Sequence, residues 1–90
     1  MKVEISPHAK KRLAIRKISE DLVLNTLRNP DNTLFDEETG YFIAVKKINN
    51  KLLIVAFLLI DEIIRVISAF LTSKFNIAER RIRSGRWKLI

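Results

Sequence analysis

The sequence predicts an α+β domain in which an N-terminal helical hairpin packs on an antiparallel meander β-sheet, followed by a C-terminal helix or tail. Three observations predict this fold. Two segments with helical periodicity and N-cap serines come first, and four strand-like segments joined by short turns follow them. The length of 90 residues is enough for one hydrophobic core. We therefore expect a single domain over residues 1–90, of which residues 75–90 form a basic tail.

The two helices are predicted from their caps. Ser6 followed by Pro7 favours a helix start, with serine as N-cap and proline at the first helical position, and this helix should run to about Arg16. Ser19 caps a second helix, which Asn29-Pro30-Asp31 ends. Because the link between the two helices is short, they are expected to form a hairpin.

The strands are predicted from apolar runs that alternate with short turns from Thr33 onward. Short connections between neighbouring strands indicate antiparallel pairing in a meander. The predicted strands are Val3–Ile5, Thr33–Asp36, Tyr41–Ile48, Lys51–Ile60 and Ile63–Thr72.

The register of the sheet follows from its turns. If Asn49-Asn50 is a two-residue turn, Phe42 pairs with Phe57, and an equally tight next turn sets Phe57 against Val66. Both faces of the sheet are then mostly apolar, so each needs a cover. The helical hairpin can cover one, and the segment Phe75–Ile90 or a second protomer the other. The first predicted face is Phe42, Ala44, Val55, Phe57, Val66, Ser68 and Phe70, and the second is Ile43, Val45, Ile54, Ala56, Leu58, Arg65, Ile67 and Ala69.

Composition limits the classes of function. Seventeen Lys and Arg against ten Asp and Glu give a net charge of +7, which favours an anionic partner such as RNA or an acidic protein. The chain has no cysteine, so disulfides and thiolate metal sites are excluded and a reducing cytoplasmic location is expected. One histidine and scattered acids predict no metal site and no cofactor. The apolar run Leu52–Ile60 is too short to span a membrane.

A stripe of His8, Arg12 and Arg16 is the main candidate for chemistry. These residues are spaced i, i+4, i+8, so they share one side of the first helix, next to its apolar anchors Ala9 and Leu13. One interpretation is a site for phosphate binding and proton transfer. The other is structural, with His8 bonded to a nearby carboxylate or carbonyl and the arginines paired with an acid. The candidate acids are Glu20, Asp21 and Asp36.

The same stretch carries a resemblance to a known family. The run H-A-K-K-R-L-A-I-R-K-I-S-E-D-L-V from His8, together with R-N-P-D, resembles an uncharacterised family of small domains grouped with the RelE/ParE-like toxins. The strand Val66–Phe70 is similar to the last strand of that family, and the likeness covers most of residues 6–74. The family commonly has a glycine where Lys17 stands, so Lys17 either holds a left-handed conformation or the helix ends differently. The resemblance implies a helical hairpin on a curved antiparallel sheet.

For function, the resemblance implies a toxin-type protein that binds or cuts RNA. Metal-independent RNA cleavage needs a base, a proton donor and cations for the phosphate. His8 could be the base or the acid, and Arg12 and Arg65 could hold the phosphate. Arg65 sits among apolar strand neighbours, so we expect an anion or a carboxylate beside it. Candidate nucleic-acid-binding residues are Arg16, Lys74, Arg80, Arg81, Arg83 and Arg86, and candidate stacking surfaces are Tyr41 and Phe75.

The tail leaves two interpretations open. Asn76–Arg83 has helical spacing and Ser84-Gly85 ends it, after which Trp87, Leu89 and Ile90 form an apolar hook. The hook either packs on a sheet face or a partner protomer, or anchors a basic arm along nucleic acid. The alternative to an endoribonuclease is a non-enzymatic interaction module, either a homodimer or one half of a toxin-antitoxin pair with an acidic antitoxin-like partner.

Overall fold

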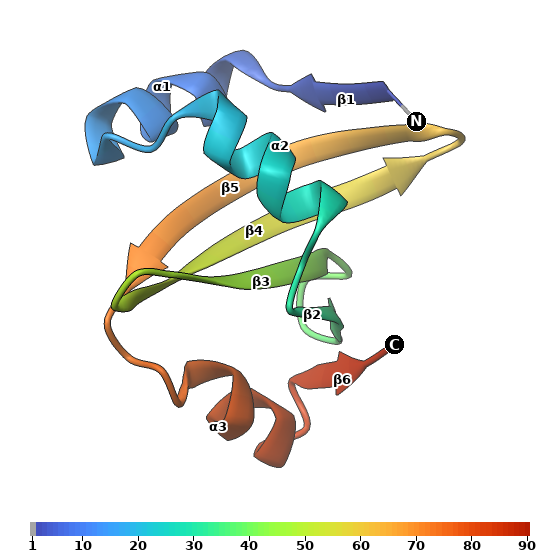
Figure 1. Ribbon diagram of the computed structural model, residues 1–90. Helices are drawn as coiled ribbons and strands as arrows, with labels where there is room; N and C mark the ends of the chain where they lie inside the picture. Colours follow the sequence, from blue (N-terminus) through green and yellow to red (C-terminus); the bar gives the residue numbers. More distant parts are fainter. Residues whose placement is uncertain (1) are drawn as a thin grey trace.

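A computed structural model describes residues 2–90 and shows one curved sheet with helices on both of its faces (Figure 1). The predicted α+β class is confirmed. The helices are α1 (Pro7–Arg16), α2 (Glu20–Arg28) and α3 (Ile77–Arg83). The strands are β1 (Lys2–Ile5), β2 (Asn32–Asp36), β3 (Phe42–Ile48), β4 (Lys51–Ile60), β5 (Ile63–Thr72) and β6 (Trp87–Leu89).

The sheet has six strands in the order β1-β5-β4-β3-β2-β6. Strands β2 to β5 form the predicted antiparallel meander, but β1 pairs with β5 in parallel, so the sheet is mixed. The prediction of a purely antiparallel sheet was therefore wrong. The apolar hook packs on the sheet only in part, because Trp87–Leu89 forms a strand beside β2 in which Trp87 joins the core of one face while Leu89 is exposed.

Helices α1 and α2 begin at the serines that the sequence indicates. The Ser6 side chain accepts a hydrogen bond from the Ala9 N–H at 3.1 Å, and the Ser19 side chain accepts one from the Leu22 N–H at 3.1 Å. Helix α1 packs mainly on β5, whereas α2 packs on β3 and β4. Each of the two helices therefore packs mainly on the sheet and only slightly against the other helix.

Lys17 ends α1 in the left-handed conformation, with φ 58° and ψ 40°. Its N–H donates to the Ala14 carbonyl at 3.2 Å, and the Ile18 N–H donates to the Leu13 carbonyl at 2.9 Å. These bonds satisfy carbonyls that the end of a helix leaves free. The prediction that Lys17 holds a left-handed conformation is confirmed. Its β-carbon makes this conformation sterically less favourable than it would be for glycine.

We expect Lys17→Gly to raise the free energy of unfolding by about 0.5–1 kcal/mol, because glycine adopts this conformation without steric cost. Urea denaturation of the two proteins measures the difference. Lys17→Ala is the control, since it removes the same charge and side chain but keeps the strained β-carbon, and it should give no such gain. A destabilised glycine variant would show that the strain at Lys17 is negligible.

A bulge in β5 changes the faces of the sheet. Phe42 pairs with Phe57 and Phe57 with Val66, as predicted, but Ala56 pairs with Ser68, which leaves Ile67 as an extra residue. One extra residue reverses the alternation beyond it. The assignment of Ser68 and Phe70 to the first face and of Ala69 to the second was therefore wrong. Ala69 joins the core under α1 and α2, and Phe70 packs on the opposite face.

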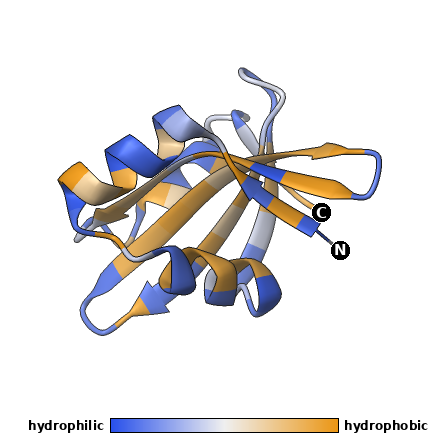
Figure 2. Cartoon of the chain, turned by 90° about the horizontal axis from the view of Figure 1, so that it is seen from above, coloured by the Kyte–Doolittle hydropathy of each residue, from blue (hydrophilic) through white to orange (hydrophobic). Residues whose placement is uncertain are grey.

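Each face of the sheet has its own core. Leu13 and Val23 of the first two helices pack on one face with Val55 and Val66, and Leu34, Ile54 and Trp87 form the core on the other. Ile77 and Ala78 of α3 pack against this second core, so the predicted covering role of residues 75–90 is confirmed. Figure 2 shows the strands as largely hydrophobic and the turns as hydrophilic. No helix within residues 2–90 has the length and apolar character needed to cross a membrane.

Candidate nucleic-acid interface

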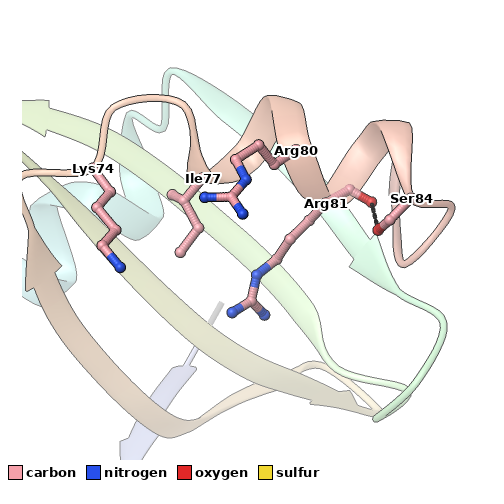
Figure 3. Close-up of a pocket in the computed structure, with 5 residues that line it drawn as sticks. All are labelled: Lys74, Ile77, Arg80, Arg81 and Ser84. Atoms are coloured by element: carbon pink, nitrogen blue, oxygen red, sulfur yellow. Dashed lines mark hydrogen bonds between the residues drawn. The ribbon is translucent and has the colours of Figure 1, made fainter.

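Three cations gather along α3 and the loop before it, and we call Lys74, Arg80 and Arg81 the α3 basic cluster. They line a cavity of about 370 Å³ together with Ile77 and Ser84. Figure 3 shows the three charged side chains directed into the same space. Among residues 2–90 none of the three has an acidic side chain within ion-pair distance. Their charges are therefore available to an anion.

Local backbone contacts fix the ends of this segment. The Lys74 N–H donates to the Thr72 hydroxyl at 3.1 Å, directly after β5 ends. The Ser84 hydroxyl donates to the Arg81 carbonyl at 3.0 Å, where α3 ends (Figure 3). Both bonds satisfy backbone groups that a strand or helix end leaves free. The α3 basic cluster is thus held between a strand and a capped helix end.

A second cavity of about 200 Å³ lies beside the first, on the sheet face that α3 covers, and we call it the Trp87 cavity. Arg81 lines both cavities, and its guanidinium lies 5.0 Å from the centre of the Trp87 ring, which is a cation–π distance. The aromatic walls are Tyr41, Phe70 and Trp87, and the polar ones are Asp36, Thr39, Ser68, Arg81 and Arg86. Aromatic and cationic groups therefore meet at one place.

The β5 bulge brings Ser68 and Phe70 into the Trp87 cavity, since both would lie on the opposite face without it. Arg16 reaches this wall from α1. Its guanidinium donates to the Ala69 carbonyl at 2.8 Å and to the Ser68 hydroxyl at 3.4 Å. These two hydrogen bonds hold the Arg16 guanidinium at the edge of the sheet, next to the Trp87 cavity.

Asp36 is the buried charge of the site, with an exposed fraction of only 3%. Its carboxylate accepts hydrogen bonds from Arg86 at 3.2 and 3.3 Å and from the N–H groups of Glu38 at 2.9 Å and Thr39 at 3.4 Å. Burial acts to raise the Asp36 pKa, but these bonds, together with the nearby Trp87 indole, outweigh it and lower the pKa to about 2. The same pairing raises the pKa of Arg86.

This ion pair joins the tail to the rest of the sheet. Asp36 ends β2 and is the register partner of Trp87 in β6, next to Arg86. The Trp87 ring is buried, and its Nε1 lies near the Asp36 carboxylate but forms no hydrogen bond within residues 2–90. The Asp36 carboxylate is thus an anchor that holds β6, and with it Arg81, in place.

The structure separates the six predicted nucleic-acid-binding residues into three groups. Lys74, Arg80 and Arg81 form the α3 basic cluster, while Arg16 lies at the β5 edge. The other two are paired with acids. Arg83 contacts Glu79 at 2.9 Å, and Arg86 contacts both Asp36 and Glu38. Their charges are therefore partly neutralised within the chain.

The three candidate catalytic residues, His8, Arg12 and Arg65, are all exposed. Within residues 2–90 no hydrogen bond or ion pair joins them, and they line none of the cavities described here. The argument that Arg65 needs a neighbouring anion was wrong, because water reaches its side chain. The expected acidic partners of the stripe were wrong for Arg16, which instead bonds to β5.

Sequence reasoning missed three parts of this site. Lys51 and Phe70 line a further cavity with Arg16, and neither was a candidate. Asp36 was considered only as a partner for arginines of the first helix. The sequence did contain a signal for Lys51, because this lysine directly follows the predicted Asn49-Asn50 turn and is therefore the first residue of a strand. The pairing of Asp36 with Arg86 had no such signal, since it depends on β6.

Comparison with known proteins gives one match. A family model described as a domain of unknown function (DUF4258) matches residues 5–71, which is most of the chain. The match includes Arg16, Asp36, Ser68 and Phe70 and ends before Lys74. No curated protein and no solved structure matches. The chain therefore belongs to the DUF4258 family of domains of unknown function.

Proposed function

We propose that this protein binds single-stranded RNA on the sheet face covered by α3, as a toxin-type protein of the RelE-like kind. The observation that carries the proposal is the sharing of Arg81 between a cluster of three unpaired cations and a cavity with aromatic walls. Cations bind the phosphate backbone, and aromatic rings accept bases by stacking. The net charge of +7 supports the same kind of ligand.

A single strand fits this arrangement better than a duplex. The cavity volume of about 200 Å³ and its partly exposed Tyr41 and Phe70 walls suit an unstacked base, whereas duplex RNA keeps its bases inside. The α3 basic cluster adjoins this cavity because Arg81 lines both. The bound phosphate would therefore be next to the base that enters the cavity.

We expect the variant Lys74→Gln/Arg80→Gln/Arg81→Gln to bind a fluorescent single-stranded RNA at least about tenfold more weakly than the wild type, because three phosphate contacts are lost. Fluorescence anisotropy at one salt concentration measures the affinities. The matched control removes three exposed cations from α1 and α2, Lys10→Gln/Lys11→Gln/Arg28→Gln, and so gives the same net charge. Equal losses in the two variants would show that only overall charge matters and would contradict the site.

A homodimer is a second proposal, and a groove of about 530 Å³ between α3 and β6 favours it. Its walls include the exposed apolar residues Phe75, Ile82 and Leu89. We expect light scattering to give twice the chain mass of 10.5 kDa and Leu89→Lys to return the monomer. A monomeric wild type that binds an acidic, antitoxin-like protein through this groove would instead favour a toxin-antitoxin partner.

A further inference from the structure

We propose that the edge of the sheet at Arg16 and Lys51 is a second phosphate-binding subsite, which holds the strand of RNA after it leaves the Trp87 cavity. This inference rests on the proposed RNA binding and deepens it, because it gives the ligand a path with two charged ends. It requires an RNA that is longer than one nucleotide and is engaged on both sides of the cavity.

The two ends are connected through Phe70. This side chain lines the Trp87 cavity and also lines a separate, more open cavity of about 510 Å³, whose other walls are Arg16, Ile18, Lys51 and Leu71. Arg81 connects the first cavity to the α3 basic cluster in the same way. Charged, aromatic and charged groups thus follow one another from α3 to the β5 edge.

Arg16 is held in a position suitable for a ligand. Its Nη1 is bonded to the Ala69 carbonyl and the Ser68 hydroxyl, and a guanidinium has five N–H donors, so others stay free for a phosphate. Fixing the guanidinium before binding lowers the entropy cost of ordering it. No acid within residues 2–90 forms an ion pair with Arg16 or Lys51.

The strand edge is open at this place. Strand β1 pairs only with residues Ile63 to Val66 of β5, so the second half of β5 pairs with β4 on one side and has no strand on its other side within residues 2–90. Lys51 starts β4 directly after the Asn49-Asn50 turn and is exposed. The subsite is therefore accessible from solvent, and no element has to move before RNA reaches it.

The test compares two RNA lengths in the same anisotropy assay. A single strand of about 10 nucleotides, within the roughly 4–16 that one small domain can occupy, should reach both subsites, and a dinucleotide should reach only the α3 basic cluster and the cavity. Arg16→Gln/Lys51→Gln should weaken binding of the longer RNA on the order of tenfold and leave the dinucleotide unchanged. The triple variant of the α3 basic cluster should weaken both.

Controls separate the possible failures. Lys51→Gln alone removes an exposed side chain that holds no bond within residues 2–90, so it should weaken the longer RNA without lowering the melting temperature, even if loss of Arg16 disturbs α1. Lys10→Gln/Lys11→Gln gives the same charge change on another side of α1. If the longer RNA binds Arg16→Gln/Lys51→Gln and this control equally well, the second subsite is wrong while the α3 site stands. If wild type binds neither RNA, the proposed function itself is wrong.

Discussion

Asp36→Asn is expected to lower the free energy of unfolding at pH 7 by about 2–3 kcal/mol. The pairing with Arg86 and the backbone N–H groups lowers the Asp36 pKa from its ordinary value of 3.8 to about 2, and a tenfold change in proton affinity corresponds to about 1.4 kcal/mol. The substitution also leaves the partly buried Arg86 guanidinium facing an amide instead of a carboxylate, which adds to the cost. Urea denaturation at pH 7 measures the loss.

The pH dependence gives an independent check. The folded pKa of Asp36 is lower than the unfolded one, so its contribution is fully present above about pH 4 and is lost as pH falls toward 2. The stability difference between wild type and Asp36→Asn should therefore shrink over that window. Glu38→Gln is the matched control, because Glu38 contacts the same arginine at 3.4 Å but is exposed and should cost little. A constant difference from pH 7 to 2 would contradict this role of Asp36.

His8→Gln should reduce the rate of RNA cleavage by a hundredfold or more if His8 is a general acid or base, since that is the usual contribution of such a group. Glutamine keeps a hydrogen-bonding side chain of similar size but does not titrate near neutral pH. The measurement is the cleavage rate of a defined RNA without added metal. Helix α1 should stay intact, because His8 is exposed and Ser6 still caps the helix.

The outcomes of this test distinguish an enzyme from a binding module. If wild type cleaves RNA and His8→Gln cleaves it as fast, the catalyst is elsewhere, and Arg12→Gln and Arg65→Gln are tested next. If wild type binds RNA but leaves it uncut, the protein is a binding module. In that case the affinity of His8→Gln for RNA should equal that of wild type, because His8 lines neither the α3 basic cluster cavity nor the Trp87 cavity.

Much of the fold follows from local signals that the sequence states directly. Ser6, Ser19 and the Asn49-Asn50 turn set the starts of the helices and the pairing of β3 with β4, because caps and two-residue turns depend on a few adjacent residues. The errors lie where distant segments meet. The parallel pairing of β1, the extra residue Ile67 and the short strand β6 have no comparable local signature.

The candidate site shows the same division. A basic tail with a helix was predictable from composition and spacing, and two of its cations, Arg80 and Arg81, gather with Lys74 in the α3 basic cluster. The neutralisation of Arg86 was not predictable, because it depends on β6 lying beside Asp36. Ser68 and Phe70 were assigned to the wrong face since a single bulged residue reverses every later side chain of the strand.

The central claim is that the α3 basic cluster binds RNA phosphates. The most direct test of this claim is how the affinity for RNA depends on salt concentration. In a plot of the logarithm of affinity against the logarithm of salt concentration, each phosphate contact to a single strand makes the negative slope steeper by about 0.7. The variant Lys74→Gln/Arg80→Gln/Arg81→Gln loses three such contacts and should reduce the magnitude of the slope by about 2. The Lys10→Gln/Lys11→Gln/Arg28→Gln control should keep a slope close to that of wild type. A wild-type affinity that ignores salt, or a slope that the triple variant leaves unchanged, would contradict the claim.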